Sequence, residues 1–362
     1  MKNMKGKNDA VDQILSDIST YIESKDMSNM PAHLYDGKMG LCIYYFLMAR
    51  YTGEDKHKER AESIIEEVYR ECKKYTITDQ LSFETGLAGI AFGITYLVRN
   101  EFMEADLDDI LQEIDDFIFK RISIKTTAEL SEEPHLLLGV AFYLIYTIKW
   151  RNNEATEFIQ LRKELLIHII NALDLFNNKS GYTPTVREPF LFDLSCYLLP
   201  KYLYIIGELY RLGLYEIKLD RIIEGLTHFV RGAYPVLQAN RLYLLAAIYH
   251  LQEIRPLPEW ETHIQCLENS LDIRQMLHKE FRDKAITINN GLAGLLLLLN
   301  KIPEAKKFSF YKELKDELVE KICQSSYFTP ITPMDEMLGI VNGSSGIAVS
   351  LILNEYMKDH EA

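Results

Sequence analysis

Five positions in the chain place a polar side chain directly before an apolar stretch. They are Asp36, Thr85, His135, Asn290 and Asn342. If the apolar stretches are helices, the Asp, Thr and Asn side chains are expected to accept hydrogen bonds from the free N–H groups of the first turn. Brought together at one end of a bundle, the same positions would form a polar ring facing a ligand. The two roles are compatible, and both stay open.

His135 differs from the other four residues because histidine is a poor helix cap. Glu132 lies three residues before it. A nearby carboxylate raises the pKa of an imidazole towards the range that suits a general base. We therefore predict a catalytic set of His135 with Glu132, Glu84 or Asp36. The alternative is that His135 is a surface residue of a loop.

The elements that position these residues recur about every 50 residues. Glycine pairs of the form G-x-x-G precede apolar stretches at residues 37–40, 86–89, 291–294 and 343–346. Gly139 continues the spacing, and weaker units centre near Asp193 and at 238–241, which makes seven units. A repeat of this length, with one supersecondary unit per copy, is typical of stacked helical arrays.

Amphipathic stretches alternate with the apolar ones, at 61–75, 107–118, 160–176, 215–229, 263–281 and 308–323. Their period indicates helices with one solvated face, whereas a helix that is apolar nearly all round is buried. One such pair cannot bury its apolar side alone, but stacked pairs can. The pattern predicts an all-α toroid, a closed barrel of seven helical hairpins. It forms a single domain over residues 1–362, with the helical segment 1–30 packed on the outside.

Composition excludes several classes of protein. The formal net charge is −13, which argues against a nucleic-acid partner. No apolar run approaches the about 20 residues of a membrane span, and the polar N-terminus shows no secretory signal. The five cysteines are far apart and form no C-x-x-C pair, so reduced thiols are expected. We expect a cytoplasmic protein.

Several of these motifs resemble those of lanthionine synthetase C-like proteins. The matching segments read "LYDGKMGLCIYYFLMARYTG", "SFETGLAGIAFGITYL", "TINNGLAGLLLLL" and "LGIVNGSSGIAVSLIL". The resemblance runs from about His33 to Asn354. It implies a seven-hairpin α/α toroid that modifies a ribosomally made peptide. In such proteins a cysteine thiol adds to a dehydrated serine or threonine and forms a thioether ring.

The resemblance also implies a zinc ion that activates the thiol, held by a Cys before the fifth repeat and a Cys-His pair before the sixth. In this sequence Asn289 and Asn290 stand where the Cys-His pair is expected, and residues 233–241 contain no Cys. Asparagine is a poor zinc ligand, so we predict that the zinc site is lost and that no cofactor is bound. The family's other acid–base groups would fall at Pro189 and Glu132.

Substrate contacts are predicted for the polar residues at the repeat starts, namely Asn289, Asn290, Arg241, Asn342 and Thr85. Arg241 would bind a carboxylate of a peptide substrate or leader peptide, or else form a structural salt bridge. Three functions stay open. The first is zinc-independent thioether cyclisation, and the second is non-catalytic binding of a peptide or a maturation enzyme, as a pseudo-cyclase. The third is a carbohydrate-active toroid that uses two of the carboxylates Glu84, Asp36, Asp335 and Glu336.

Overall fold

The structure is a computed structural model that describes residues 9–77, 80–150, 156–179, 188–302, 306–328 and 337–361. All regular elements within these ranges are helices, so the all-α prediction is confirmed. Asp335 and Glu336, two of the carboxylates considered for a carbohydrate enzyme, lie outside the described residues. Within the described part, no helix has the length and apolarity needed to cross a membrane.

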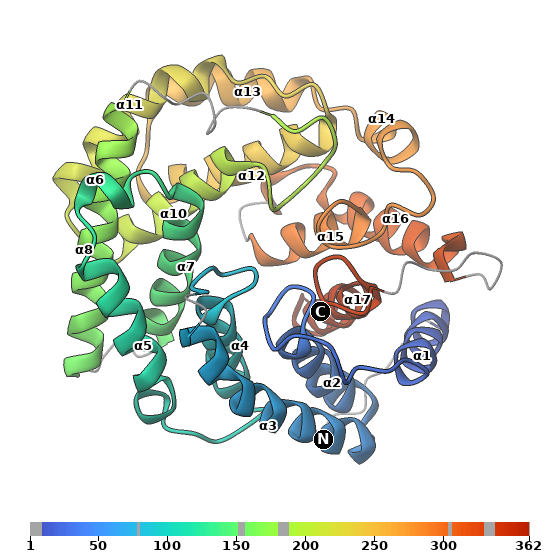
Figure 1. The fold of residues 1–362 in the computed structure, drawn as a ribbon. Helices are drawn as coiled ribbons and strands as arrows, with labels where there is room; N and C mark the ends of the chain where they lie inside the picture. The colour runs from blue at the N-terminus through green and yellow to red at the C-terminus, as the bar shows by residue number, and fades with distance from the viewer. Residues whose placement is uncertain are drawn as a thin grey trace.

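A ring of buried helices surrounds the centre of the molecule (Figure 1). Each inner helix contacts the next one, and the last contacts the first, so the ring is closed. The inner helices are α2 (Lys38–Thr52), α4 (Leu87–Arg99), α7 (Pro134–Trp150), α10 (Leu198–Arg211), α12 (Gln238–Ile254), α15 (Leu292–Lys301) and α17 (Ser344–Glu361). The predicted closed toroid is therefore confirmed.

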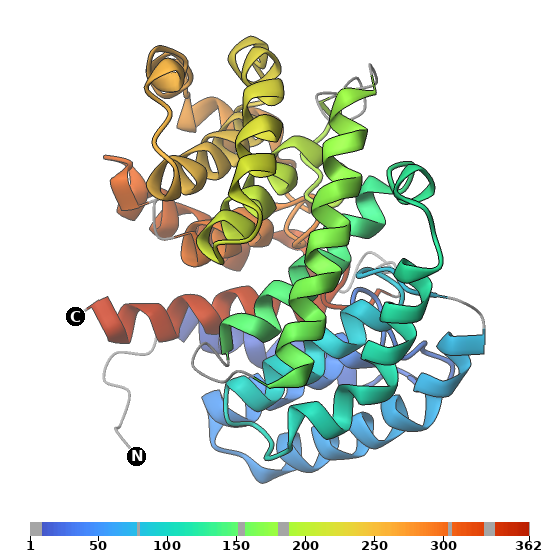
Figure 2. The same cartoon turned by 90° about the vertical axis from the view of Figure 1, so that its left-hand side faces the viewer.

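A second set of helices covers the ring from outside (Figure 1). In chain order these are α1 (Asp9–Glu23), α3 (Asp55–Ile77), α5 (Leu107–Ser123), α8 (Glu157–Asn178), α11 (Glu216–Gly232), α13 (Glu261–Asn269) and α16 (Tyr311–Gln324). Helices α3 to α16 each follow the inner helix that they cover. Helix α1 is different, because it packs on α17, the last inner helix. The first and the last helix of the described residues thus form one pair, and in Figure 2 α17 runs out to the edge of the molecule.

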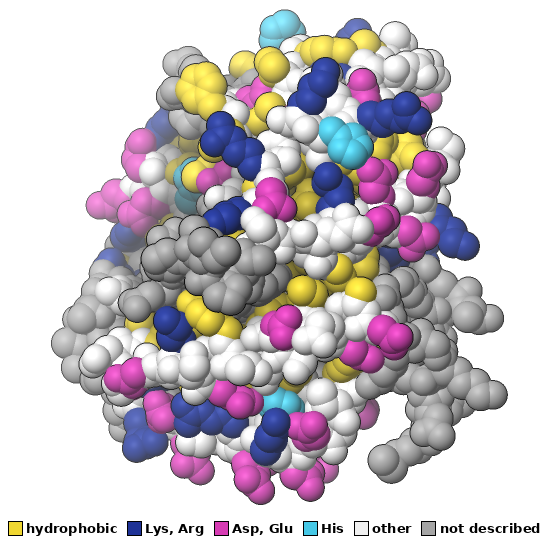
Figure 3. Space-filling model, turned by 90° about the vertical axis from the view of Figure 1, so that its right-hand side faces the viewer, with side chains coloured by type: hydrophobic (Ala, Val, Ile, Leu, Met, Phe, Trp, Pro, Cys, Tyr) yellow, Lys and Arg dark blue, Asp and Glu magenta, His cyan; other side chains and the backbone are white. Residues whose placement is uncertain are grey.

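The two sets differ in how their side chains are buried. On α11 the buried residues Leu219, Ile222, Ile223, Leu226 and Val230 follow the spacing of one helical face. On α12, by contrast, every residue from 238 to 248 is buried. On the face that Figure 3 shows, at the right-hand side of Figure 1, basic and acidic side chains are interspersed. The outer helices thus carry the solvated surface, and the inner helices form the wall of the central space.

The inner helices that follow glycine pairs begin in the same way. The first N–H of each helix donates to the carbonyl seven residues earlier, as from Leu87 to Gln80 at 3.0 Å and from Leu292 to Ala285 at 3.0 Å. The loop before each helix folds back onto the helix start, so its backbone leaves no room for a side chain on the glycines. A Cβ on Gly89, for example, would overlap the carbonyl oxygen of Phe83. The glycine pairs therefore exist because backbone carbonyls, rather than side chains, cap these helices.

The three inner helices without glycine pairs use other caps. Helix α7 begins at Pro134, which has no N–H to satisfy. The turn before α10 is held by Asp193, whose carboxylate accepts from the N–H of Cys196 at 2.9 Å. Helix α12 is capped by a distant residue, because the carboxylate of Glu280 accepts from the N–H of Gln238 at 2.7 Å. Side-chain caps do not require close backbone approach, so these repeats do not need the glycine pair.

One predicted outer helix is shorter than expected. The stretch 263–281 was predicted as continuous, but α13 ends at Asn269. The hydroxyl of Ser270 donates back to the carbonyl of Cys266 at 2.7 Å, and Asp272 then caps the separate helix α14 (Ile273–Gln275). Local hydrogen bonds from Ser and Asp compete with helix continuation. The chain next forms a π-helical turn, Met276–Glu280, that delivers Glu280 to α12.

Candidate functional site

Loops from five repeats meet at one end of the ring and are joined by backbone hydrogen bonds. The bonds run from Leu194 to Asn289 at 2.9 Å and from Asn289 to Val341 at 3.0 Å. They continue from Val341 to Tyr35 at 3.1 Å and from Tyr35 to Glu84 at 3.2 Å, with the N–H donating each time. We call this chain of residues (194, 289, 341, 35 and 84) the loop belt. It connects the starts of α10, α15, α17, α2 and α4.

Two of the predicted ligand-binding residues strengthen the loop belt instead. Asn342 donates its side-chain amide to Asp36 at 2.7 Å, and its N–H donates to the same carboxylate at 3.2 Å. The side-chain oxygen of Asn289 accepts from the N–H of Ser195 at 3.0 Å. These contacts link neighbouring repeats, so Asp36, Asn289 and Asn342 hold the end of the ring together.

Asn290 and Thr85 make only local contacts. Asn290 accepts from the hydroxyl of Thr287 at 2.8 Å, and Thr85 lies 3.1 Å from the hydroxyl of Ser82. The predicted side-chain N-capping is therefore wrong at α2, α4 and α15. The cap residues there are the glycines 37, 86 and 291, which have no side chain to offer.

The loop belt has a gap at the third repeat. Within the described ranges, no backbone hydrogen bond connects the start of α7 to residue 84 or residue 194. His135, the second residue of α7, is exposed at this gap. Glu84 ends the belt on one side, and Leu194 ends it on the other. The gap is therefore the place where His135 meets both solvent and the interior.

A cavity of about 340 Å³ lies inside the gap, and we call it the first chamber. His135, Glu84 and Lys201 all contribute to its wall. Most of the remaining wall is apolar or aromatic, with Tyr35, Phe83, Phe142, Tyr204 and Tyr243 among its residues. Three titratable side chains, from the loop before α4, from α7 and from α10, thus converge on one largely apolar space. Such a combination is the usual form of a binding or active site.

Lys201 is the functional candidate that sequence reasoning missed. Its ammonium donates to the carbonyl of Ser195 at 2.8 Å. Burial lowers the pKa of Lys201, while the nearby Glu84 opposes that shift. A signal was present in the sequence, because Lys201, Tyr204 and Glu208 stand at i, i+3 and i+7 of an otherwise apolar stretch. That spacing places three polar groups on one helical face, which here faces the central space.

The surroundings of His135 are different from those predicted. Burial and the charge of Lys201 lower the pKa of His135, whereas Glu84 acts in the opposite direction. Glu132 was predicted as the partner of His135, but it is exposed and forms an ion pair with Lys179 at 2.5 Å. The predicted rise in the pKa of His135 is therefore wrong, because a cation and an apolar wall outweigh the carboxylate.

Arg241 does not line the first chamber. Its side chain is buried, and the guanidinium donates to the carbonyls of Ser270 at 2.5 Å and Pro235 at 2.8 Å. It also lies 4.3 Å from the centre of the Tyr234 ring. Arg241 therefore fastens the end of the outer helix α13 to α12, and within the described residues it neither lines the first chamber nor forms a salt bridge.

A second cavity of about 400 Å³, the second chamber, adjoins the first. The two share Phe142, Tyr204, Leu297 and Lys301 as wall residues. The charged residues of the second chamber are Arg99, Lys149, Glu208 and Lys301. They lie in the C-terminal halves of their helices, so the second chamber extends away from the loop belt.

Among the described residues, Glu208 is the one buried carboxylate in the wall of the second chamber. It contacts Lys149 at 2.6 Å, His250 at 3.0 Å and Arg211 at 3.0 Å. Burial alone would raise the pKa of Glu208, but the contacts with His250 and Lys149 outweigh it and lower the pKa to about 2. Glu208 therefore stays ionised and cannot deliver a proton near neutral pH.

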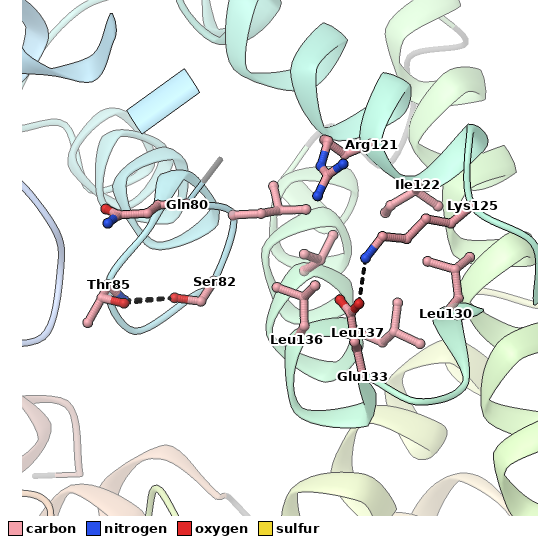
Figure 4. Close-up of a pocket in the computed structure, with 12 residues that line it drawn as sticks. Gln80, Ser82, Thr85, Arg121, Ile122, Lys125, Leu130, Glu133, Leu136 and Leu137 are labelled. Carbon is pink, nitrogen blue, oxygen red and sulfur yellow. Dashed lines mark hydrogen bonds and ion pairs between the residues drawn. The ribbon is translucent and has the colours of Figure 1, made fainter. Parts of the chain in front are cut away.

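A third pocket lies beside the gap, between the loop before α4 and helices α5, α6 (Thr127–Leu130) and α7 (Figure 4). Thr85 and Ser82 line it on one side, and Arg121, Lys125 and Glu133 on the other. Lys125 and Glu133 form an ion pair at 2.5 Å on this second side. Thr85 thus faces this outer pocket rather than the first chamber.

The zinc ion implied by the resemblance does not fit the residues present. Within the described part of the chain, no group of three His, Cys, Asp or Glu residues is arranged to hold a metal ion. At the two places where ligands are expected before α15, the side-chain oxygens of Asn289 and Asn290 are engaged with Ser195 and Thr287. The donor set therefore lacks thiolate and imidazole, and we derive no step through zinc.

These features define an α/α toroid with a polar entrance to its central cavity. Residues 28–188 match the family model for lanthionine synthetase C-like protein. The resemblance predicted from the sequence is thus confirmed over residues 28–188, which are similar to lanthionine synthetase C-like proteins.

Among solved structures, the fold is similar to that of "Nisin cyclase", with a TM-score of 0.60 at 14% sequence identity. The match covers 98% of this chain and 95% of that one. At this identity the likeness concerns the fold. No curated protein matches the sequence.

Proposed function

We propose that the protein modifies a ribosomally made peptide by adding a cysteine thiol to a dehydrated serine or threonine, without zinc. His135 and Lys201 are the residues that would carry this reaction, with Glu84 as a positioning residue. The observation that supports the proposal is their convergence on the first chamber, at the gap in the loop belt. The chemistry requires a base near the thiol and a positive charge near the electron-rich product of its addition.

In the proposed reaction, the imidazole of His135 accepts the proton of the substrate thiol. The lowered pKa keeps this imidazole neutral and able to accept a proton at neutral pH. The sulfur then bonds to the β-carbon of the dehydroamino acid, and the electron pair of the double bond moves towards its carbonyl. The ammonium of Lys201 stabilises the enolate. A proton returns from His135 to the α-carbon, so S–H has added across C=C without any oxidant.

A carbohydrate-active function has less support. Such enzymes need two carboxylates on opposite sides of a substrate, one of which must be able to donate a proton. In the two chambers the carboxylates of the described residues are Glu84 and Glu208. Glu208 is held ionised by its contacts with Lys149 and His250, and Asp36 is bound to Asn342. The required pair of groups is therefore missing from the described cavity.

The proposed reaction also implies a place and a partner. An upstream maturation enzyme must first remove water from the serine or threonine of the peptide. We propose that both act in the cytoplasm, where thiols stay reduced. The free cysteines Cys196 and Cys266, both exposed, suit that compartment.

The test uses the purified full-length chain with a peptide that contains one cysteine and one dehydroalanine. Ring formation is followed by loss of reactivity towards a maleimide at unchanged peptide mass, against the rate without protein. We expect His135→Ala to lower the protein-dependent rate by about 100-fold or more. Addition of a zinc chelator should leave the rate unchanged. His278→Ala, a change of an exposed histidine on the outer surface, is the matched control.

The pH profile gives a second readout. Lys201→Met removes a cation that lowers the pKa of His135, so the acidic limb of the profile should move to higher pH. Glu84→Gln removes a carboxylate that raises this pKa, so the limb should move to lower pH. Tight binding of the peptide with no reaction above background would instead establish a pseudo-cyclase and overturn the proposed activity.

A further inference from the structure

The second chamber contains two cations without an acidic partner. Arg99 and Lys301 both line it, and they end helices α4 and α15. Within the described residues, neither has a carboxylate within 4.0 Å, whereas Lys149 in the same wall is paired with Glu208. The wall therefore carries two positive charges that its own residues leave unbalanced.

The two cations are also close enough to disfavour one another. Burial lowers the pKa of Lys301, and the charge of Arg99 lowers it further. Arg99 lies with its guanidinium 4.6 Å from the centre of the Tyr146 ring, in the same chamber. Holding two like charges in one partly apolar space costs folding free energy unless an anion enters. Such an arrangement is typical of a site whose negative partner comes from a ligand.

Helix polarity alone does not explain the arrangement. A cation in the last turn of a helix is favoured by the helix dipole wherever its side chain points. Arg50 illustrates this case, because it lies in the last turn of α2 but donates to the carbonyl of Asn100 and lies 3.7 Å from the Phe102 ring centre. Arg99 and Lys301 differ from Arg50 in that both line the central cavity.

We propose that Arg99 and Lys301 bind a carboxylate of the substrate peptide, either its C-terminus or an acidic side chain. Lys301 lies at the junction of the two chambers. A peptide whose reactive residues are at His135 could therefore continue past Phe142 and Tyr204 and place its carboxylate between the two cations. This inference rests on the proposed peptide substrate and adds that the peptide must carry a carboxylate.

The test measures binding of unreactive peptides to the full-length protein by titration calorimetry. The probes are Ala-Gly-Ala-Gly-Phe with a free C-terminus, the same peptide as its C-terminal amide, and the amide with Glu in place of Phe. We expect the free carboxylate to bind about tenfold more tightly than the amide. The preference should disappear in the variant with both Arg99→Gln and Lys301→Gln, and persist in Arg50→Gln. Preference for the Glu amide over the Phe amide would assign the site to an acidic side chain instead of the C-terminus.

Stability separates a ligand site from a structural role. Because the two cations repel, Lys301→Gln should raise the urea midpoint of the free protein while it weakens binding of the carboxylate peptide. A lowered midpoint together with equal binding of all three peptides would overturn the proposal. His135→Ala should retain the carboxylate preference, so a failure of the proposed reaction remains distinguishable from a failure of this site.

Discussion

The inner helices begin in two ways, and the polar residues His135 and Lys201 of the first chamber both belong to one of them. One group follows a glycine pair and consists of α2, α4, α15 and α17. The loops before these helices cap them with the same backbone hydrogen bond. The middle repeats differ: α7 begins at Pro134, the turn before α10 is held by Asp193, and α12 is capped by the distant Glu280. His135 and Lys201 both lie in the second group. The regular starts supply most of the rigid belt, and the irregular starts supply the entrance.

This contrast also explains where polar side chains are left available. At the regular starts, residues such as Asp36 and Asn342 are used to join neighbouring loops. At the third repeat the described residues make no belt hydrogen bond, and His135 is exposed. Because the third repeat is not part of the loop belt, the His135 side chain can face both solvent and the first chamber.

A large effect is expected at a regular start. Gly89→Ala would place a methyl group on the carbonyl oxygen of Phe83, which is backbone and cannot move alone. We expect a loss of about 3 kcal/mol in the free energy of unfolding, measured with urea. Gly232→Ala is the control, because a methyl group there meets nothing within 4 Å. Equal effects of the two changes would refute the account of the glycine pairs.

A second prediction concerns the ionic cluster on α10, in the irregular group. The pKa of Glu208 is lowered from 4.5 to about 2, so its contribution is complete above the unfolded pKa and is lost as pH falls towards 2. We expect about 3 kcal/mol of acid-sensitive stability from this side chain. Urea unfolding between pH 6 and pH 2 would measure it. In Glu208→Gln the slope over this range should flatten, and an unchanged slope would contradict the prediction.

The smallest effect is expected at the cap of α12. Glu280→Ala removes the carboxylate that accepts from the N–H groups of Gln238 and Ala239. Loss of a helix cap costs about 1–2 kcal/mol, and urea unfolding is again the measurement. Lys279→Ala, a change of the exposed neighbouring residue, should have almost no effect. If Glu280→Ala were equally neutral, side-chain capping would not explain the missing glycine pair.

Much of the fold was predictable from the sequence, because glycine spacing and helical periodicity report directly on backbone packing. The apolar stretches after residues 40, 89, 294 and 346 are indeed inner helices. The prediction was less accurate at the fourth repeat, where α10 begins at Leu198 after a turn held by Asp193. The pattern there shows only that an apolar helix follows, not how many residues the turn uses.

The site was predicted only in part. His135 and Glu84 do line one cavity, but Glu132 and Arg241 have other partners. Sequence position states which residue precedes a helix, whereas the direction of a side chain depends on the neighbouring repeat. Lys201 was missed because it stands one turn inside an apolar helix rather than at its start. A charged residue inside an apolar helix indicates a cavity-facing position as clearly as a polar residue at the start of the helix does.

The pairing of α1 with α17 has a consequence for biosynthesis. The first helix of the chain finds its covering partner only when the last one has been made, more than 300 residues later. At a synthesis rate of about 5–20 residues per second, that interval is on the order of 15–70 s. Until then the nascent protein is an open arc with unsatisfied apolar surface at both ends. Synthesis of α17, rather than any local folding step, therefore sets the earliest moment at which the ring can close.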